Sequence, residues 1–531
     1  MTELASRYTA DTSSALADGW SLSRLTRPSR LAGANGMQVG PDGRVYVAQV
    51  AGSCVSAIDV DTGRIERVST LGGGIVAPDD LAFDEAGNMY CTEITEGRVC
   101  MRAPDGSVKV IQGDMPVANP ITYHRGMLIA GECRFDARIM ELDRNGGAPR
   151  VILENVPMAN AFEVGPDGKL YFPAQGANEI WRVSLEGGAP EVVATGLGGP
   201  DSVKFHPDGY IVSTQAASGQ VLKIDPRTGD KSVLADIGPG LDNVIFVGKR
   251  TFVSHITGSI HEITAPGVAR PLVERGLQWP LGLAVAADGT VFIADGGFNY
   301  TVAPGGSPEL IGNLFAPGFP GWLRAVAAAG PGEWIVTTAN GDVARWNPAA
   351  AEHVMLAQGY DRLMGVALGA KGQIAFAETG TGKLHGLEGG AVSELASGLA
   401  GPMGVAIAPD GSVYVAECEA GRVVRVSGGR TETVMDGLVR PEGLTISDGK
   451  LYAVDSVAKQ VVECDLSGGN QRVVASGLPV GAQEGIIGRH TGGVGIFCGP
   501  MWSFTGMATA PDGTLLVAGD AEGSVLALRP A

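Results

Sequence analysis

The chain has 531 residues and a formal net charge of −18, from 39 Lys and Arg against 57 Asp and Glu. This charge argues against nucleic acid and an anionic membrane surface as partners, because both bind clustered positive charge. It leaves a small cation or a neutral small molecule as the simpler ligand. The sequence shows no run of 18 apolar residues and no basic segment leading into an apolar one, so we expect a cytoplasmic protein without a membrane span.

The seven cysteines include no CxxC motif and are odd in number, so they do not indicate a disulfide framework. Cys91 and Cys100 are placed to face each other across one hairpin. We interpret them, like the others, as buried thiols.

A unit of about 40 residues recurs twelve times along the chain. Each unit holds four short runs of β-branched and apolar residues, and a turn such as Pro207-Asp208-Gly209 joins the first two runs. Asp-Gly between two such runs is a strong hairpin signal, because Gly accepts a positive φ. Four antiparallel strands in a period of this length are typical of a β-propeller blade.

Twelve blades exceed the four to eight of a usual ring. We therefore predict an all-β protein of two tandem six-bladed β-propellers. Residues 1–19 would be an N-terminal extension, 20–266 the first propeller and 267–531 the second. An insertion at 481–504 is expected to be a lid over one face or a loop that packs the two rings together.

The sequence allows two ways of closing the two rings. In the first, each ring uses its own N-terminal outer strand, residues 20–26 for the first propeller and 269–277 for the second. In the alternative, the N-terminal strand crosses to the twelfth blade, which otherwise stops after its third strand.

Two positions in every unit are expected at one mouth of the propeller. The inner position precedes the innermost strand, and the outer position follows 13 to 15 residues later. In the first six units the inner residues are Asn35, Asp79, Asn119, Asn160, Asp201 and Asp242. The outer residues are Gln49, Glu93, Glu132, Gln175, Gln215 and His255.

Six inward oxygen-bearing side chains suit a hard cation, which takes six to eight oxygen ligands. Without a cation, crowded carboxylates would repel one another and their pKa values would rise. The competing interpretation is structural, because Asp and Asn are good turn formers beside Gly or Pro. The six-fold recurrence favours a metal site.

In the last six units the inner position is mostly not acidic or amide-bearing. It reads Leu281, Arg324, Met364, Met403, Glu442 and Thr505. Trp279, Trp322, Trp502 and Phe504 lie close by in sequence. The second mouth is therefore either a pocket for an apolar ligand or a plugged channel.

The motifs "MANAFEV" around Asn160 and "GPDSVKF" around Asp201 resemble the SMP-30/gluconolactonase/LRE-like superfamily, with NHL repeats as a looser match. The resemblance covers residues 31–531 as two tandem copies. It implies six-bladed propellers with one divalent ion on the axis, and often lactone or ester hydrolysis. The family ligands are a Glu from the first blade and an Asn and an Asp from later blades, and here Asn35 replaces that Glu. Ca²⁺ is the expected ion, with Zn²⁺, Mg²⁺ or Mn²⁺ as alternatives.

The residues and the resemblance together predict a metal-dependent hydrolase of a lactone or another ester. Asp201 or His255 would take a proton from the attacking water, with Glu93 and Glu132 as reserve bases. One alternative is a lyase or isomerase that uses the same ion, or a pocket in the second propeller with Arg324 as anion stabiliser and Glu442 as base. Another is a non-catalytic small-molecule-binding or scaffold protein, and a homo-oligomer stays open.

Overall fold

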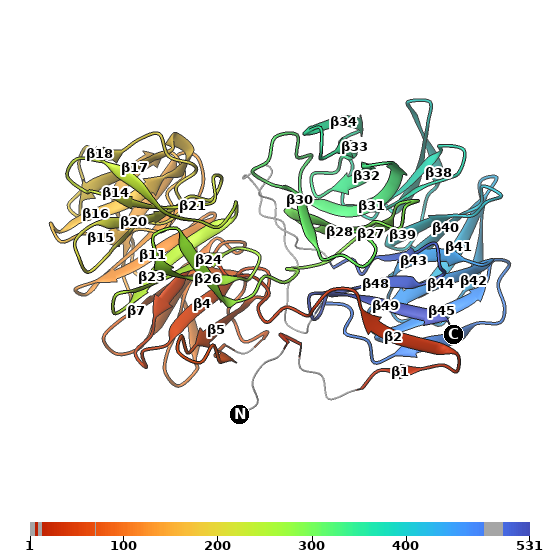
Figure 1. Cartoon of the computed structure of the whole chain (residues 1–531), viewed down its shortest axis with the longest axis horizontal. Coiled ribbons are helices and arrows are strands. Elements are labelled where there is room, and N and C mark those ends of the chain that lie inside the picture. The colour runs from red at the N-terminus through yellow and green to blue at the C-terminus, as the bar shows by residue number, and fades with distance from the viewer. Residues whose placement is uncertain (1–5, 9–12, 70, 483–502, 531) are drawn as a thin grey trace. The chain divides into compact units, whose positions relative to one another are not determined.

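The computed structural model describes residues 6–8, 13–69, 71–482 and 503–530 (Figure 1). Within these ranges the chain forms strands and one short 3-10 turn, η1 (Gln175–Ala177). The strands make twelve antiparallel sheets of four strands, one of which carries a fifth. The predicted all-β class and the repeated four-stranded blade are confirmed. The described part of the chain contains no helix with the length and apolar character that a membrane crossing requires.

The described residues fall into two compact units. Unit 1 holds residues 29–276, and unit 2 holds residues 6–28, 277–482 and 503–530. Each unit contains six of the twelve sheets.

The sheets of unit 1 are built from consecutive strands. They are β3–β6 (Met37–Val39, Val45–Gln49, Cys54–Ile58, Ile65–Arg67), β7–β10 (Pro78–Phe83, Met89–Glu93, Arg98–Arg102, Val108–Gln112), β11–β14 (Ala118–His124, Met127–Glu132, Ala137–Leu142, Arg150–Val156), β15–β18 (Glu163–Val164, Lys169–Ala174, Glu179–Ser184, Glu191–Ala194), β19–β22 (Lys204–Phe205, Ile211–Thr214, Gln220–Ile224, Lys231–Asp236) and β23–β26 (Leu241–Val247, Arg250–His255, Ile260–Ala265, Val268–Val273).

The sheets of unit 2 follow the same plan, except that two of them recruit strands from the N-terminal segment. They are β27–β30 (Leu283–Val285, Val291–Asp295, Phe298–Val302, Glu309–Asn313), β31–β34 (Leu323–Gly330, Glu333–Thr338, Val343–Asn347, Glu352–Ala357), β35–β38 (Leu363–Leu368, Ile374–Glu378, Lys383–Glu388, Ala391–Ala396), β39–β42 (Pro402–Ile407, Val413–Glu417, Arg422–Ser427, Arg430–Met435), β43–β46 with β1 (Pro441–Ser447, Lys450–Asp455, Gln460–Asp465, Arg472–Ser476, Ala15–Leu16) and β47–β49 with β2 (Met507–Thr509, Leu515–Gly519, Ser524–Pro530, Trp20–Arg24).

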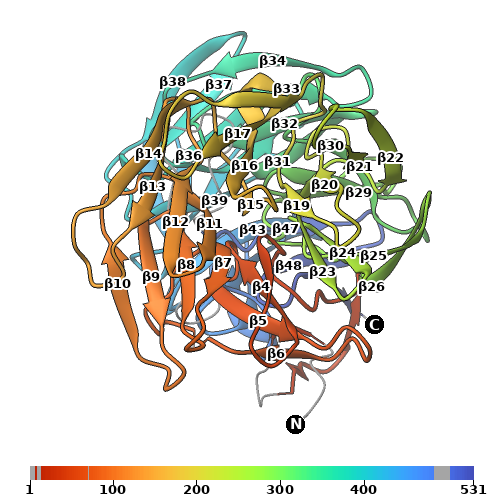
Figure 2. The ribbon, with the colours of Figure 1, turned by 90° about the vertical axis from the view of Figure 1, so that its left-hand side faces the viewer.

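In Figure 2, which faces unit 1, the six sheets of this unit follow one another in chain order around a common centre. The first strand of each sheet is innermost. Neighbouring innermost strands touch, as β3 does with β7 and with β23. The Asp-Gly turns form as predicted: Gly209, between β19 and β20, has φ +90° and donates its N–H to the His206 carbonyl at 2.8 Å.

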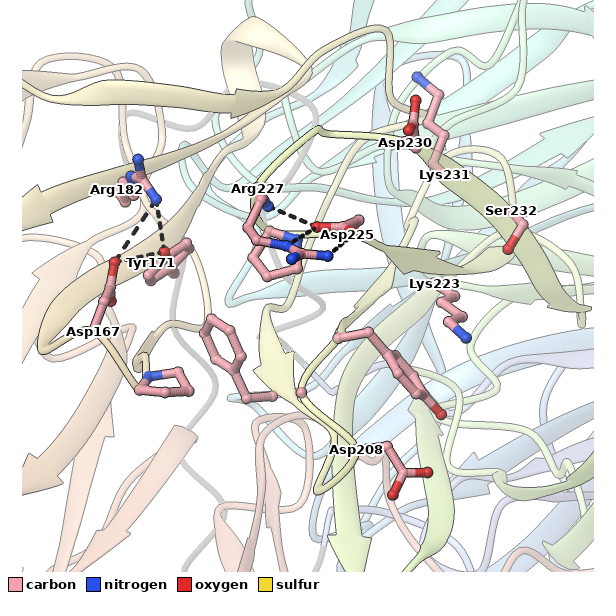
Figure 3. A pocket seen from close by; sticks show the side chains of 15 residues that line it. Asp167, Tyr171, Arg182, Asp208, Lys223, Asp225, Arg227, Asp230, Lys231 and Ser232 are labelled. Atoms are coloured by element: carbon pink, nitrogen blue, oxygen red, sulfur yellow. Dashed lines mark hydrogen bonds and ion pairs between the residues drawn. The ribbon is translucent and has the colours of Figure 1, made fainter.

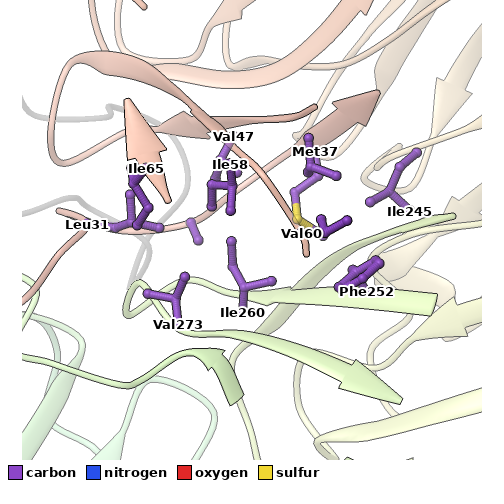
Figure 4. Packing of buried hydrophobic residues seen from close by; sticks show 12 residues of the cluster. Leu31, Met37, Val47, Ile58, Val60, Ile65, Ile245, Phe252, Ile260 and Val273 are labelled. Atoms are coloured by element: carbon purple, nitrogen blue, oxygen red, sulfur yellow. The ribbon is translucent and has the colours of Figure 1, made fainter. Parts of the chain in front are cut away.

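Apolar side chains pack the first sheet of unit 1 against its sixth sheet (Figure 4). Met37 and Ile58 of the first sheet and Phe252 and Ile260 of the sixth are all at most 1% exposed. Each such side chain contributes roughly 1.5–3 kcal/mol when fully buried. Packing of apolar side chains, and not a shared strand, therefore joins these two sheets.

The strand expected to close the second propeller belongs instead to unit 1. Val268–Val273 is β26, which pairs with β25 of the same sheet. The predicted closure by residues 269–277 is therefore wrong. The predicted boundary at 266/267 is also wrong, because it lies in the β25–β26 hairpin, and the units divide between Gly276 and Leu277.

The N-terminal strand crosses to the last sheet of the chain, as in the alternative solution. All five residues of β2 pair with β49, from Trp20 opposite Pro530 to Arg24 opposite Leu526. The prediction that this strand closes the first propeller is wrong. In sequence, unit 1 is therefore an insertion into unit 2.

Arg7 holds the same N-terminal segment against the first and last sheets of unit 2. Its side chain is buried and donates to the backbone oxygens of Gln278 (2.5 Å), Asp520 (2.7 Å) and Ala521 (3.1 Å). One guanidinium thus connects the backbone just before the first sheet of unit 2 to the backbone of its last sheet.

Candidate functional site

The six inner residues of unit 1 gather where the innermost strands begin. Asp79, Asn119 and Asp242 stand at the second residue of β7, β11 and β23. The other three lie just before β3, β15 and β19. Five of the six are buried at 5–8% exposure, and Asp242 is partly buried.

Amide–carboxylate hydrogen bonds link neighbouring members of this group. Asn35 Nδ2 donates to Asp242 Oδ2 at 3.1 Å, which joins the first sheet to the sixth. Asn160 Nδ2 and Gln175 Nε2 donate to the same Oδ2 atom of Asp201, at 3.1 and 3.0 Å. The structure therefore brings the Asn160–Asp201 pair together, and leaves Oδ1 of Asp201 outside these two bonds.

The three acids of this group act on one another. Burial raises the pKa of Asp79, Asp201 and Asp242 well above the usual range. The charge of Asp242 raises the pKa of Asp79 further, Asp79 does so for Asp201, and Asp201 for Asp242. Among the described residues, none donates a hydrogen bond to the Asp79 carboxylate. Three carboxylates thus share one buried region with few compensating donors.

A further acid, Asp80, lies behind this group and is not among the residues that the sequence predicted. Its carboxylate accepts from the N–H groups of Leu81 (2.9 Å) and Ile121 (3.2 Å). Burial raises its pKa to about 6, while the charge of Lys204 opposes that rise. A Cβ on Gly36 would overlap the Asp80 carboxylate, so a glycine there leaves room for the acid.

Asn243, Lys204 and Cys133 complete the polar centre of unit 1. Asn243 Nδ2 lies 3.4 Å from Asp80, and its buried Oδ1 has no hydrogen-bond partner among the described residues. Lys204 is 3% exposed and donates to the Phe162 carbonyl at 3.4 Å. Burial raises the pKa of the Cys133 thiol, and the charges of Asp201, Asp79 and Asp242 raise it further. Asp80 directly follows Asp79 in sequence, which is the signal that could have identified this second layer.

The donor chemistry of the centre fits a hard divalent cation. Carboxylate and amide oxygens are the hard ligands that such an ion takes, and the carboxyl pKa values are raised first by burial and then by mutual repulsion. Among the described residues, no three His, Cys, Asp or Glu side chains already form a group that could hold a metal ion. A bound ion would therefore take part of its ligand shell from amide, carbonyl or water oxygens, which hard cations accept.

The outer positions hold the loops that lead into the innermost strands. Glu93 Oε1 accepts from the N–H of Val76 at 2.9 Å, 17 residues earlier in the chain. Five further residues make the same bond at the same separation, at 2.7–2.9 Å: Gln49, Gln215, Asp295, Glu378 and Glu417. Since the set spans both units, the polar outer position is a loop clamp of the repeat.

Two predicted reserve bases are occupied by structural contacts. Glu93 pairs with Arg98 in addition to its clamp bond. Glu132 pairs with Arg134 at 3.0 Å and with Arg138. Both carboxylates are fully buried. The structure thus engages these two acids in backbone and arginine contacts.

His255 is also held in place at both ring nitrogens. Its Nδ1 accepts from the N–H of Thr257 at 3.2 Å, and its Nε2 lies 2.7 Å from the Pro239 carbonyl and 2.9 Å from Arg275 Nη2. Burial lowers the pKa of His255 well below the usual range, and the charge of Arg275 lowers it further. These contacts anchor a loop, and they leave no ring nitrogen facing the acids.

In unit 2, the predicted base Glu442 lies in a chain of hydrogen bonds with Arg440, Thr505 and Asp520. Glu442 accepts from Arg440 Nε at 2.9 Å and from the N–H of Thr505 at 2.7 Å. Thr505 Oγ1 donates to Asp520 at 3.2 Å. Burial raises the pKa of Asp520 to about 7, and the charge of Glu442 contributes. Arg324 is buried at 2% exposure.

Backbone fills the centre of unit 2. Its innermost strands carry Gly282, Gly365, Gly404, Gly443 and Gly506 directly after the inner position. A Cβ on Gly282 would lie 2.5 Å from Ala325 Cα and 2.8 Å from Arg324 O, and a Cβ on each of the others would likewise overlap the next strand. The cavity that these glycines line has a volume of about 30 Å³, which is the scale of one or two water molecules.

The sequence left two interpretations of this centre, a pocket for an apolar ligand and a plugged channel. The small cavity favours the plugged channel. Trp279 and Trp322 are buried at 6% and 9% exposure, and neither indole N–H has a partner among the described residues. Trp502 lies outside the described residues, as does most of the 481–504 insertion.

Cys91 and Cys100 stand directly opposite each other on β8 and β9, as predicted. Both are buried free thiols, and burial raises both pKa values.

Neither a scan against protein-family models nor a search of curated proteins finds a match to this sequence.

Proposed function

We propose that each unit is a six-bladed β-propeller and that the centre of unit 1 binds a divalent cation to hydrolyse a lactone or another ester. Contacts between innermost strands support the closed rings: β3 touches β23 in unit 1, and β27 touches β47 in unit 2. The observation that carries the functional proposal is the group of three mutually repelling carboxylates, those of the buried Asp79 and Asp201 and the partly buried Asp242. Ca²⁺ is the proposed ion, since the donors are oxygens and the ligand shell is incomplete without water.

The residues of the centre divide into three roles. Asp79 and Asp242 would hold the ion, while Asn35 orients Asp242 through its 3.1 Å bond. Asn160 and Gln175 fix Oδ2 of Asp201. Oδ1 of Asp201 would then accept the proton of the attacking water. The bound ion would polarise the ester carbonyl and make that water more acidic.

His255, Glu93 and Glu132 have no role in this proposal, because each is occupied by a loop or by arginine. Asp80 and Lys204 would act from behind the group, by setting its total charge. A lyase or isomerase reaction at the same ion uses the same residues, so the product formed from the substrate decides between the two.

The test combines cation binding with turnover. We expect Ca²⁺ at 100 times its Kd to stabilise the full chain by about 2.7 kcal/mol. Asp79→Asn and Asp242→Asn should abolish that stabilisation. A panel of aldonolactones, aromatic lactones and simple esters, followed by pH-stat, should show turnover that falls at least about 100-fold in Asp201→Asn.

The matched control is Asp520→Asn, which alters a buried acid in the centre of unit 2. It should leave both the Ca²⁺ affinity and the turnover unchanged. Absence of cation binding in the wild type would refute the metal site. Cation binding without turnover of any panel member would favour the non-catalytic binding protein.

A further inference from the structure

The residue directly after each outer position of unit 1 stands close to the inner group. The N–H of Val50 donates to Oδ1 of the inner residue Asn35 at 3.2 Å, and that of Cys133 donates at 2.9 Å to the Val117 carbonyl, in the loop that leads to an inner residue. The pKa of the Cys133 thiol, raised first by burial, is raised further by the charges of three inner acids, which places the thiol near them. We call the six residues at this position the collar: Val50, Ile94, Cys133, Gly176, Ala216 and Ile256.

The collar is apolar and uneven in size. None of its members carries a charged, amide or hydroxyl side chain. Its three β-branched members come from the sixth, first and second sheets of unit 1 and are half-buried. The fourth and fifth sheets contribute only Gly176 and Ala216, and these two sheets begin just after Asn160 and Asp201. The collar therefore leaves most room beside the Asn160–Asp201 pair.

Phe135 stands at this open side of the collar. It follows Cys133 by two residues, in the loop between β12 and β13, and its Cε1 would lie 3.0 Å from a Cβ built on Gly176. Because the fourth sheet has glycine in the collar, the Phe135 ring can lie against that sheet where a collar side chain would otherwise be. Gly176 directly follows Gln175, whose Nε2 donates to Oδ2 of Asp201 at 3.0 Å. An aromatic ring of the third sheet thus lies next to the residue that orients the proposed base.

The Phe135 ring is open to solvent. Phe135 is 65% exposed, the largest value among the exposed large apolar side chains of the described residues, and the others are Val and Leu. Full burial of such a side chain contributes roughly 1.5–3 kcal/mol, and the fold leaves most of that gain unused. Small-molecule sites are lined mainly by apolar and aromatic side chains around a few polar groups. The collar and Phe135 beside the inner acids have this composition.

A groove elsewhere in unit 1 offers no comparable ring. It has a volume of about 900 Å³ and lies between the sheets β15–β18 and β19–β22 (Figure 3). Of its aromatic side chains, Tyr171 is 3% exposed and Phe205 is half-buried. The ring of Tyr210 stacks on His206, with centroids 4.4 Å apart. An aromatic group of a ligand therefore finds a freer surface at Phe135.

We propose that Phe135 and the collar bind an aromatic ring of the substrate, so that aromatic lactones and esters are the substrate class of unit 1. This inference rests on the proposed ester hydrolysis. With the scissile carbonyl at the cation, the substrate ring would lie beside Gly176 and pack on Phe135, edge to face or offset. An aldonolactone would place hydroxyls against a collar that offers them no side-chain partner, and unpaired polar groups lose affinity.

Two lactones that differ by an aromatic ring test the assignment, on the full chain with Ca²⁺. 3-Isochromanone and δ-valerolactone both open to a primary alcohol, and only the first carries a benzene ring. We expect kcat/KM to be at least about tenfold higher for 3-isochromanone. Phe135→Ala should lower that value about tenfold, mainly through KM, since it removes the apolar contact. Phe135→Tyr, which keeps the ring, should stay within about twofold of the wild type.

Three measurements separate a substrate contact from a structural role. In Phe135→Ala, the Ca²⁺ affinity and the turnover of δ-valerolactone should each change less than twofold. The matched control is Val192→Ala, which trims a 55% exposed apolar side chain on β18 and should leave kcat/KM for both lactones within twofold. Equal kcat/KM of Phe135→Ala and the wild type for 3-isochromanone would overturn the inference and leave the cation centre standing.

A binding measurement decides the ring contact even if the wild type hydrolyses neither lactone, which would refute the proposed function. The probe is then 2-(hydroxymethyl)phenylacetate, the product that 3-isochromanone would give, observed by saturation-transfer NMR. Saturation of its ring protons by the wild type that is lost in Phe135→Ala would support the contact. No saturation by the wild type, or equal saturation by the variant, would overturn it.

Discussion

Directly after the inner position, unit 2 carries glycine in five of its six innermost strands, whereas unit 1 carries glycine only at Gly36. The other unit 1 residues there are Asp80, Pro120, Ala161, Ser202 and Asn243. The glycines let each strand approach the backbone of the next, and the remaining cavity is about 30 Å³. In unit 1, side chains occupy the same place, and two of them are the acid Asp80 and the amide Asn243. One residue position thus separates a backbone-filled centre from a polar one.

The loop clamp is common to both units, which shows that the scaffold is shared. Glu93 of unit 1 and Glu417 of unit 2 accept from a backbone N–H 17 residues earlier, and each pairs with an arginine five residues later. The units therefore differ in two features. One is the residue that follows the inner position, and the other is the recruitment of β1 and β2 from the N-terminal segment by the sheets of unit 2.

The largest effect is expected from removing the N-terminal segment, so that the chain begins at Ser29. Unit 2 would lose β2 and β1, the bonds of Arg7, and the packing of Trp20 and Leu22 against its core. We expect a loss of about 5 kcal/mol or more from two large apolar side chains and several hydrogen bonds. Calorimetry should show the transition of unit 2 shifted or lost, with that of unit 1 unchanged.

Arg7→Gln gives a milder version of the same test, because the strands stay and the guanidinium bridge is lost. It should lower the stability of unit 2 alone, by less than the truncation does. Equal destabilisation of unit 1 by either change would contradict the assignment of residues 6–28 to unit 2.

The next largest effect is expected from a methyl group at the axis of unit 2. In Gly404→Ala the Cβ would overlap the Glu442 carbonyl of the next strand. Overpacking of this kind costs about 1–3 kcal/mol. Gly330→Ala is the control in the same unit, since its Cβ would have only a distant contact, 3.9 Å from Glu333. A result in which both variants are equally stable would show that backbone contact at the axis is not tight.

Much of this organisation could be predicted from local sequence signals. The Asp-Gly turns and the 40-residue period predict the twelve four-stranded sheets, because hairpin geometry depends on a few adjacent residues. The repeat also predicts that Asn160 and Asp201 lie together, because they hold the same position in consecutive units.

Ring closure could not be settled in this way. Trp20–Arg24 has the pattern of an outer strand, but pairing with Leu526 depends on contacts about 500 residues apart. Glu93 and Glu132 have the character of reserve catalytic acids in the sequence. Their bonds to a backbone N–H or to arginine become visible only in three dimensions.

The pH dependence of unit 1 in EDTA should report the crowded acids. Asp79, Asp201 and Asp242 have folded pKa values raised above the ordinary 3.8, so the stability linked to their protons is present below about pH 4 and is lost as pH rises. We expect the unit 1 transition to fall by several degrees between pH 4 and pH 8. Ca²⁺ should restore it at pH 8, and Asp201→Asn should flatten the curve.

Unit 2 provides the internal comparison for this titration. The pKa of Asp520 is raised to about 7, so unit 2 should also lose stability as pH rises through 7. Ca²⁺ should not restore that loss, because unit 2 lacks the group of acids. Rescue of both transitions by Ca²⁺ would place cation binding outside the centre of unit 1.

The smallest effect is expected from Glu93→Gln and Glu417→Gln, which compare the same clamp in the two units. An amide oxygen can still accept from Val76 or Ala400, so the loop stays attached and only the charge on the arginine pair is lost. Each change should therefore cost about 1 kcal/mol, and by similar amounts in the two units, because Arg98 and Arg422 are partly exposed and stay solvated. Turnover should be unchanged in Glu93→Gln, measured beside Asp201→Asn on the same substrate. A loss of turnover in Glu93→Gln without loss of stability would return Glu93 to the catalytic group and remove the distinction between scaffold and axis.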